Sequence, residues 1–167
     1  QLLEVYAKAS VLYDDAFYRR TARRTAEYIL REMTDPATGA FFSAQDAEVN
    51  HREGQNYLWT REQFESVLGP EDAKLAAAVY GLDRGPNFRD PHHPPSPNEP
   101  MTNVLVMVDR PQALASRLGM TEAELLAKLD GINDRLCAAR QKRDQPLRDD
   151  KCIASWNGLM IRAMATA

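Results

Sequence analysis

The sequence predicts an all-α fold in which buried and half-buried helices alternate. Residues 1–13 and 159–165 are apolar on nearly every side, which is typical of helices buried on most of their surface. Residues 15–33 and 121–140 carry apolar side chains on one stripe only, as helices that face water do. This alternation is what a double-layered ring of helical hairpins requires, because its inner helices contact neighbours on all sides and its outer helices face solvent.

A short β excursion is predicted after the second helix. Asp35 to Gly39 favours a turn. Residues 40–43 and 56–59 are rich in aromatic side chains and predict the two strands of a hairpin. The polar residues 46–54 would then form the loop between these strands.

Two capping boxes mark helix starts in the middle of the chain. Thr60 with Gln63 predicts a helix that runs to about residue 68. Thr121 with Glu124 predicts the start of the long amphipathic helix. In each box the hydroxyl and the residue three positions later satisfy the free N–H groups of the first turn.

Proline dominates the segment between these helices. Residues 83–100 contain six of the ten prolines, so little regular structure is expected there. Outside this segment the pattern predicts two further helices, at residues 71–80 and 111–118, and one short strand at residues 103–108.

Composition narrows the classes of partner and compartment. Twenty-one basic and 24 acidic residues give a net charge of -3, and the basic residues are dispersed, which argues against nucleic acid. No apolar run reaches membrane-spanning length, so no membrane partner is expected. Cys137 and Cys152 form no CxxC motif, which favours free thiols in the cytoplasm over a disulfide. The histidines lack metal-ligand spacing, so neither a metal nor a cofactor is expected. The uncapped first and last helices predict that the chain is an excerpt of a longer polypeptide.

The loop that precedes the last helix is the candidate site. Asp149, Asp150 and Lys151 stand side by side, and Ser155 is predicted to cap the buried helix that follows. A charged loop that feeds a buried helix would place its side chains at the mouth of a cleft. There the two carboxylates and the ammonium could act as acid, base and electrostatic support. The alternative is a structural loop tied by ion pairs among these residues and Arg148.

Neighbouring carboxylates on one loop point in different directions. Glycoside hydrolysis needs two carboxyl groups roughly 5–9.5 Å apart. One member of the Asp149–Asp150 pair would therefore work with a carboxylate on another loop, and Asp46 and Glu48 are the candidates. We also predict that Asp150 and Lys151 face the central cavity in a mutual or near-neighbour ion pair.

Aromatic and amide side chains next to the charged loop are candidates for substrate binding. Trp156 could stack on a sugar ring, and Asn157 could hydrogen-bond to its hydroxyl groups. The alternative is a buried tryptophan with Asn157 satisfying loop backbone. Trp59 on the predicted hairpin is a further candidate, although hydrophobic packing is the commoner role for such a residue.

Four strings of the sequence carry a resemblance to one family: residues 41–48, residues 53–60, residues 138–143, and Asp149-Asp150-Lys151 followed by residues 155–161. The last of these is the longest and most specific. On these strings the chain resembles, over its whole length, the spermatogenesis-associated protein 20 family, also called the domain of unknown function 255 family. Two departures are Glu48, where the family usually has aspartate, and the proline-rich stretch with His92 and His93.

The resemblance implies a larger architecture than the chain itself. It implies an (α/α)6 toroid, similar to N-acylglucosamine 2-epimerases and six-hairpin glycosidases, of which residues 1–167 would be the central portion. The rest of the toroid and an upstream thioredoxin-like domain would be its partners. We therefore expect a carbohydrate-active or carbohydrate-binding domain that uses acid/base chemistry on a sugar-like small molecule. The rival expectation is a non-catalytic helical scaffold that works with the thioredoxin-like domain.

Overall fold

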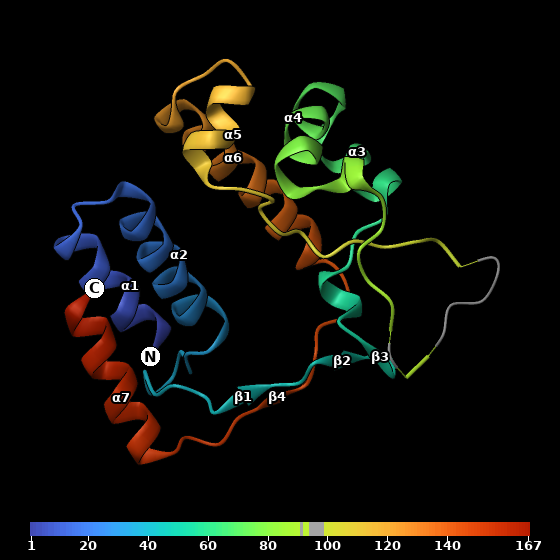
Figure 1. Ribbon diagram of the computed structural model, residues 1–167. Helices are drawn as coiled ribbons and strands as arrows, with labels where there is room; N and C mark the ends of the chain where they lie inside the picture. The colour runs from blue at the N-terminus through green and yellow to red at the C-terminus, as the bar shows by residue number, and fades with distance from the viewer. Residues whose placement is uncertain (91, 94–98) are drawn as a thin grey trace. The chain divides into compact units, whose positions relative to one another are not determined.

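The computed structural model describes residues 1–90, 92–93 and 99–167, and the chain divides into two compact units (Figure 1). Unit 1 consists of residues 1–46 and 147–167, and unit 2 of residues 47–146. Most of the regular structure is helical, as the sequence predicts. Each of the seven predicted helices is present within two residues of its expected bounds.

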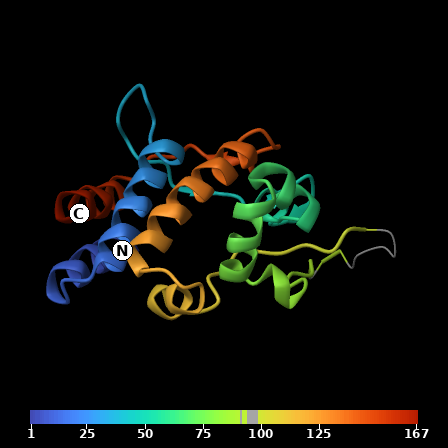
Figure 2. The ribbon, with the colours of Figure 1, turned by 90° about the horizontal axis from the view of Figure 1, so that it is seen from above.

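Unit 1 contains three helices, which the view from above shows side by side (Figure 2). They are α1 (Leu2–Leu12), α2 (Ala16–Glu32) and α7 (Ala154–Thr166). Asp15 caps the N-terminus of α2, because its carboxylate accepts hydrogen bonds from the N–H groups of Phe17 and Tyr18. The buried core of the unit is small and consists of Leu3, Ala7, Ala22, Ile29 and Ala163.

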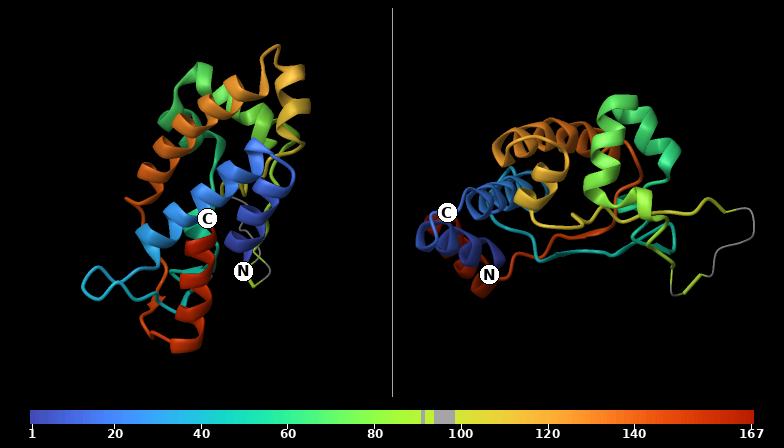
Figure 3. Two further views of the ribbon diagram at one scale, coloured as in Figure 1. Left: turned by 90° about the vertical axis from the view of Figure 1, so that its left-hand side faces the viewer. Right: turned by 45° about the horizontal axis from the view of Figure 1, so that its top comes forward.

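Two links join the distant segments of unit 1. Strand β1 (Ala44–Gln45) pairs antiparallel with β4 (Arg148–Asp149), and the ribbon views show the two segments side by side (Figure 3). In this pairing Ala44 faces Asp149. The N–H of Asp46 extends this ladder by donating to the carbonyl of Leu147 at 2.7 Å. In addition, the amide of Asn157 accepts from the N–H of Phe41 at 2.8 Å and donates to the carbonyl of the same residue at 2.9 Å.

The prediction that the first and last helices are buried on most sides is wrong for the described residues. Val5 on α1 is 59% exposed, and Ile161 on α7 is 61% exposed. The reason is geometric: α1 packs against α2 and α7 within unit 1, and its remaining faces contact no further helix there. An apolar helix surface becomes buried only where another element packs against it.

The predicted cap of the last helix is also wrong. Helix α7 begins at Ala154, and Ile153 occupies the capping position without a side-chain hydrogen bond. Ser155 therefore lies inside the first turn. The earlier start places Asn157 where its N–H donates to the carbonyl of Ile153, while its side chain binds Phe41.

Unit 2 is built on α6 (Glu122–Arg140), which packs against α3 (Arg61–Leu68), α4 (Pro70–Tyr80) and α5 (Pro111–Arg117). Both predicted capping boxes are confirmed, at Thr60 and at Thr121. Fully buried side chains of the long helix form the centre of a core that is larger than that of unit 1: Leu125, Leu129 and Ile132.

The predicted strands are misplaced. The hairpin forms from β2 (Glu48–Val49) and β3 (Arg52–Glu53), inside the expected loop. Asn50 and His51 connect these strands with positive φ at both positions, the conformation of a two-residue turn that suits right-twisted strands.

Residues of the expected strands form only isolated bridges, which pair Phe41 with Thr34 and Trp59 with Asn103. Two single-turn 3₁₀ helices complete unit 2. These are η1 (Gln55–Tyr57), which replaces part of the predicted second strand, and η2 (Leu82–Arg84). Residues 104–107, predicted as a strand, have no regular structure.

Candidate functional site

The charged loop predicted as the site is tied together by its own charges. Oδ2 of Asp149 lies 3.0 Å from Nζ of Lys151. Oδ1 of Asp150 lies 2.7 Å from Nε of Arg148. The hydrogen bond from Lys151 holds the pKa of Asp149 below its ordinary value, so this carboxylate is ionised at neutral pH. The near-neighbour ion pairs match the prediction, but the partner of Lys151 is Asp149 rather than Asp150.

Asp46 lies close to this loop. It is exposed at the end of β1, and its backbone joins the ladder with β4. The pairing of β1 with β4 therefore brings the backbone of the Asp46 segment beside that of the Asp149 segment. Glu48 is exposed on β2 in unit 2 and faces Glu53 across the hairpin.

The predicted aromatic and amide binders have different environments. Trp156 is 53% exposed on α7, so the alternative of a buried tryptophan is wrong for the described residues. The side chain of Asn157 is engaged with the backbone of Phe41, as its structural alternative predicts. Trp59 is 3% exposed and packs edge-on against Phe64, which makes it a core residue.

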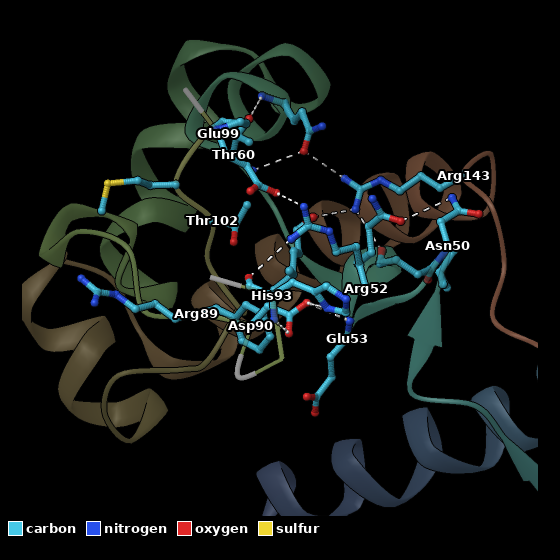
Figure 4. A pocket seen from close by; sticks show the side chains of 18 of the residues that line it. Asn50, Arg52, Glu53, Thr60, Arg89, Asp90, His93, Glu99, Thr102 and Arg143 are labelled. Carbon is cyan, nitrogen blue, oxygen red and sulfur yellow. Dashed lines mark hydrogen bonds and ion pairs between the residues drawn. The ribbon is translucent and has the colours of Figure 1, made fainter. Parts of the chain in front are cut away.

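A large polar pocket lies within unit 2, and none of the charged-loop residues lines it. Its volume is about 1260 Å³. The lining comes from the β2–β3 hairpin, from η1, from the residues after α6 and from the segment around residues 86–102 (Figure 4). Among the sequence-predicted site residues, none belongs to the described lining.

One wall of the pocket is held by β3. Arg52 forms an ion pair with Glu99 at 3.3 Å and lies 3.5 Å from the carbonyl of His93 (Figure 4). The N–H of Glu53 donates to Asp90. Burial alone would raise the pKa of Asp90, but the N–H groups of His92, His93 and Glu53 outweigh it, and the pKa lies below its ordinary value.

An adjoining wall comes from the residues that follow α6. Arg143 is half-buried and stacks its guanidinium 4.0 Å above the Trp59 ring. Its Nη1 donates to the carbonyls of Asn56 and Leu58 at 2.9 and 2.6 Å. Burial lowers the pKa of this guanidinium, and the positive charge of Arg140 adds to the effect.

Asn56 fixes η1 to the end of α6 and is itself buried. Its amide donates to the carbonyl of Asp144 at 2.7 Å, and its Oδ1 accepts from Arg140 at 2.9 Å. The same Asp144 accepts from Asn50 through its side chain at 2.8 Å. This network positions the pocket wall that includes Arg143.

Several classes of site find no support in the described residues. Over residues 1–90, 92–93 and 99–167, no group of histidine, cysteine, aspartate and glutamate side chains could hold a metal ion. Cys137 and Cys152 are both free thiols. None of the described helices is long and apolar enough to cross a membrane.

Sequence reasoning missed the pocket because its residues are far apart in the chain. Arg52, Asp90 and Arg143 belong to three segments that only the fold brings together. One signal was available: Arg143 follows the long helix, at the point where the helix dipole favours a cation. The many prolines around Asp90 predicted an irregular segment, so the sequence did not indicate that this segment lines a pocket.

Comparison with known proteins finds several relatives, and no protein-family model matches the chain. The chain is 30% identical over 180 residues, 99% of its length, to human spermatogenesis-associated protein 20. It is 30% identical over 183 residues to the rat protein of that name, and 28% identical over 147 residues to an uncharacterized protein of Caenorhabditis elegans. The chain spans 23% of the length of the human and rat relatives.

Proposed function

The chain belongs to the spermatogenesis-associated protein 20 family, and we propose that its unit 2 binds a small, sugar-like polyhydroxylated molecule in the polar pocket. The observation that carries the proposal is the mixed lining of this pocket. Sugar hydroxyl groups both donate and accept hydrogen bonds, so a sugar site needs donors and acceptors close together. The described lining supplies guanidinium and amide donors, carboxylate acceptors and hydroxyl groups.

Individual side chains support this assignment. Thr60, Thr102 and Asn50 contribute hydroxyl and amide groups to the lining, and the Thr60 hydroxyl also accepts a hydrogen bond from the N–H of Gln63 (Figure 4). Phe88 adds an apolar ring surface of the kind on which the C–H face of a sugar packs. The volume is larger than a single monosaccharide needs, so an oligosaccharide or a substituted sugar also fits.

The architecture that we propose for the longer protein is an (α/α)6 toroid. The seven α-helices of the described residues would belong to its central portion, and an upstream thioredoxin-like domain would accompany it. Exposed apolar side chains on α1 and α7 support this, because further toroid helices would cover them. We also propose a cytoplasmic location, which the two free thiols support.

A carbohydrate-active alternative places the sugar at the charged loop of unit 1 instead of in the unit 2 pocket, and assigns acid/base chemistry to Asp46, Asp149, Asp150 and Lys151. The β1–β4 pairing supports it, because the pairing brings the two acidic segments together. The local ion pairs of Asp149 and Asp150 instead favour the second candidate function, a non-catalytic scaffold. In a scaffold the charged loop only stabilises the turn before α7.

The binding proposal is tested by titrating the protein with neutral and phosphorylated monosaccharides in a calorimeter. The variant Thr102→Val removes a pocket hydroxyl while keeping the shape of the side chain, and should weaken sugar binding several-fold. Glu48→Gln and Asp150→Asn are the controls, because both residues lie outside the pocket lining. Absence of binding by any sugar would contradict the proposal, and so would equal losses in all three variants.

A further inference from the structure

We propose that Arg143 and Arg52 bind an anionic group, a phosphate or a carboxylate, carried by the ligand of the unit 2 pocket. This inference rests on the proposed function, because it specifies the charge of the sugar-like molecule at the same site. Phosphate and carboxylate share the relevant chemistry. Both present paired oxygen atoms that match the N–H groups along one edge of a guanidinium.

The charge of Arg143 is not neutralised by the protein. Its hydrogen bonds go to the backbone carbonyls of Asn56 and Leu58, and its Nη2 lies 3.5 Å from Oε1 of Gln63. These acceptors are neutral, as is the Trp59 ring below the guanidinium. Among the described residues, no carboxylate lies within ion-pair distance of Arg143.

The lack of a carboxylate partner is unusual for an arginine that is half-buried. A charge that is removed from water is normally paired with an opposite charge, because desolvation is costly. Arg143 is half-buried, and the neighbouring Arg140 adds repulsion instead of compensation. An external anion at the open edge of the guanidinium would supply the missing charge.

A matched arginine in unit 1 shows the ordinary arrangement. Arg148 stacks 4.0 Å above the Phe42 ring, the same distance that separates Arg143 from Trp59. It differs in its hydrogen bonds, since its Nε contacts the carboxylate of Asp150 at 2.7 Å. Stacking on an aromatic ring therefore does not explain why Arg143 lacks a carboxylate.

A second guanidinium lies in the same part of the pocket. Figure 4 shows Arg52 and Arg143 directed toward the region near Thr60, with Glu99 beside Arg52. Glu99 forms its ion pair with Arg52, and no described carboxylate forms one with Arg143. The exposed Lys142 also lines the pocket and adds positive charge.

Two of the other carboxylates in the pocket lining, those of Asp90 and Asp144, already accept hydrogen bonds. Asp90 accepts hydrogen bonds from the backbone of His92, His93 and Glu53. Asp144 accepts from Asn50. Neither contacts the guanidinium of Arg143, so the positive end of the pocket stays available to a ligand.

The sharpest variant is Gln63→Glu, which places a carboxylate next to Nη2 of Arg143 without removing any cation. Glutamate suits this position equally well, because residue 63 is the third helical residue of the Thr60 capping box. The variant should therefore fold normally while occupying the anion site from within. Gln112→Glu, an exposed residue of α5 outside the pocket lining, is the control for the change in charge.

The measurement is calorimetric titration of wild type and both variants with D-glucose, D-glucose 6-phosphate, D-glucuronate and inorganic phosphate. We expect one or both charged sugars to bind about tenfold more tightly than glucose, as charge-assisted hydrogen bonds allow. Gln63→Glu should abolish this difference, and Gln112→Glu should preserve it. Comparison of the phosphorylated sugar with glucuronate identifies which anion is preferred.

The outcomes separate the two proposals. If glucose binds but neither charged sugar binds more tightly, the anion site is wrong and the sugar site stands. If inorganic phosphate binds in an Arg143-dependent way while no sugar does, the anion site stands and the sugar site is wrong. Equal affinities of Gln63→Glu and wild type for every anion would show that Arg143 and Arg52 form no anion site. The conservative Arg143→Lys keeps the charge but loses the paired N–H edge, and should lose most of the preference for the charged sugar.

Discussion

Arg143 in unit 2 and Arg148 in unit 1 make the same contact with an aromatic ring and differ in the partner of their charge. Arg148 lies at the surface, pairs with the carboxylate of Asp150 two residues away, and reaches the carbonyl of Glu32 only at 3.5 Å. Arg143 binds carbonyls of Asn56 and Leu58, more than eighty residues away, and is half-buried. Two opposite charges that are neighbours in sequence can pair without holding distant parts of the fold together. An arginine that binds distant segments, in contrast, helps to join those segments. The fold should therefore depend less on the charged loop than on Arg143.

The two regions should differ most in stability when the aromatic ring below each arginine is removed. Trp59→Ala deletes a ring that is 3% exposed and supports both Phe64 and Arg143, so we expect a loss of about 3–5 kcal/mol in the free energy of unfolding. Phe42→Ala, which deletes the partly exposed ring below Arg148, should cost clearly less. Urea denaturation followed by circular dichroism measures both, and equal losses would remove the distinction between the regions.

Removal of the arginines themselves should give the next largest effect. Arg143→Met keeps the aliphatic stem but leaves two carbonyls without their donor, and should cost about 2 kcal/mol. Arg148→Met breaks an exposed ion pair and should cost less than about 1 kcal/mol. The same denaturation measurement decides, and a larger loss for Arg148→Met would reverse the comparison.

The two units can also be compared through a shared device. Asn157 in unit 1 and Asn87 in unit 2 each bind the N–H and the carbonyl of a single distant residue, Phe41 and Val104 respectively. Asn157→Ala should cost about 1–2 kcal/mol, because its bonds are partly buried. Asn87→Ala should cost less, because water can replace its exposed bonds. Thermal melts of both variants, with hydrogen exchange at Phe41 and Val104, test the difference.

The smallest effect is expected at the charged loop. Asp150→Asn removes an exposed pair with Arg148 and should change the free energy of unfolding by no more than about 0.5 kcal/mol. It should also leave sugar affinity unchanged if the unit 2 pocket is the binding site. A loss of affinity in a fully folded variant would instead move the site to the charged loop, as sequence reasoning alone first suggested.

The sequence was informative wherever local rules decide the structure. The capping boxes at Thr60 and Thr121 and the helix bounds follow from residues a few positions apart, and they are confirmed. The hairpin was misplaced because aromatic content pointed to Phe41 and Trp59, which are packing residues. The turn that actually forms depends on Asn50 and His51 adopting positive φ, a weaker signal than Asn-Gly would give.

The candidate site was less predictable because it is long-range. Nothing near Arg143 in sequence indicates that its acceptors are the carbonyls of Asn56 and Leu58. The burial of helices also depends on neighbours, which is why the apolar surfaces of α1 and α7 were overestimated as buried. Adjacent carboxylates such as Asp149 and Asp150 attract notice in a sequence, although proximity along the chain mostly lets charges pair locally.

The ladder between β1 and β4 has a topological consequence. Because the N–H of Asp46 meets the carbonyl of Leu147, the chain leaves unit 1 and returns to it through adjacent antiparallel residues. Unit 2 is thus inserted into unit 1 in the manner of a module that can be excised. A two-residue reverse turn joining Asp46 to Leu147 would be geometrically sufficient to close the gap. It would also replace a loop of about one hundred residues whose closure entropy must otherwise be overcome before α7 can dock.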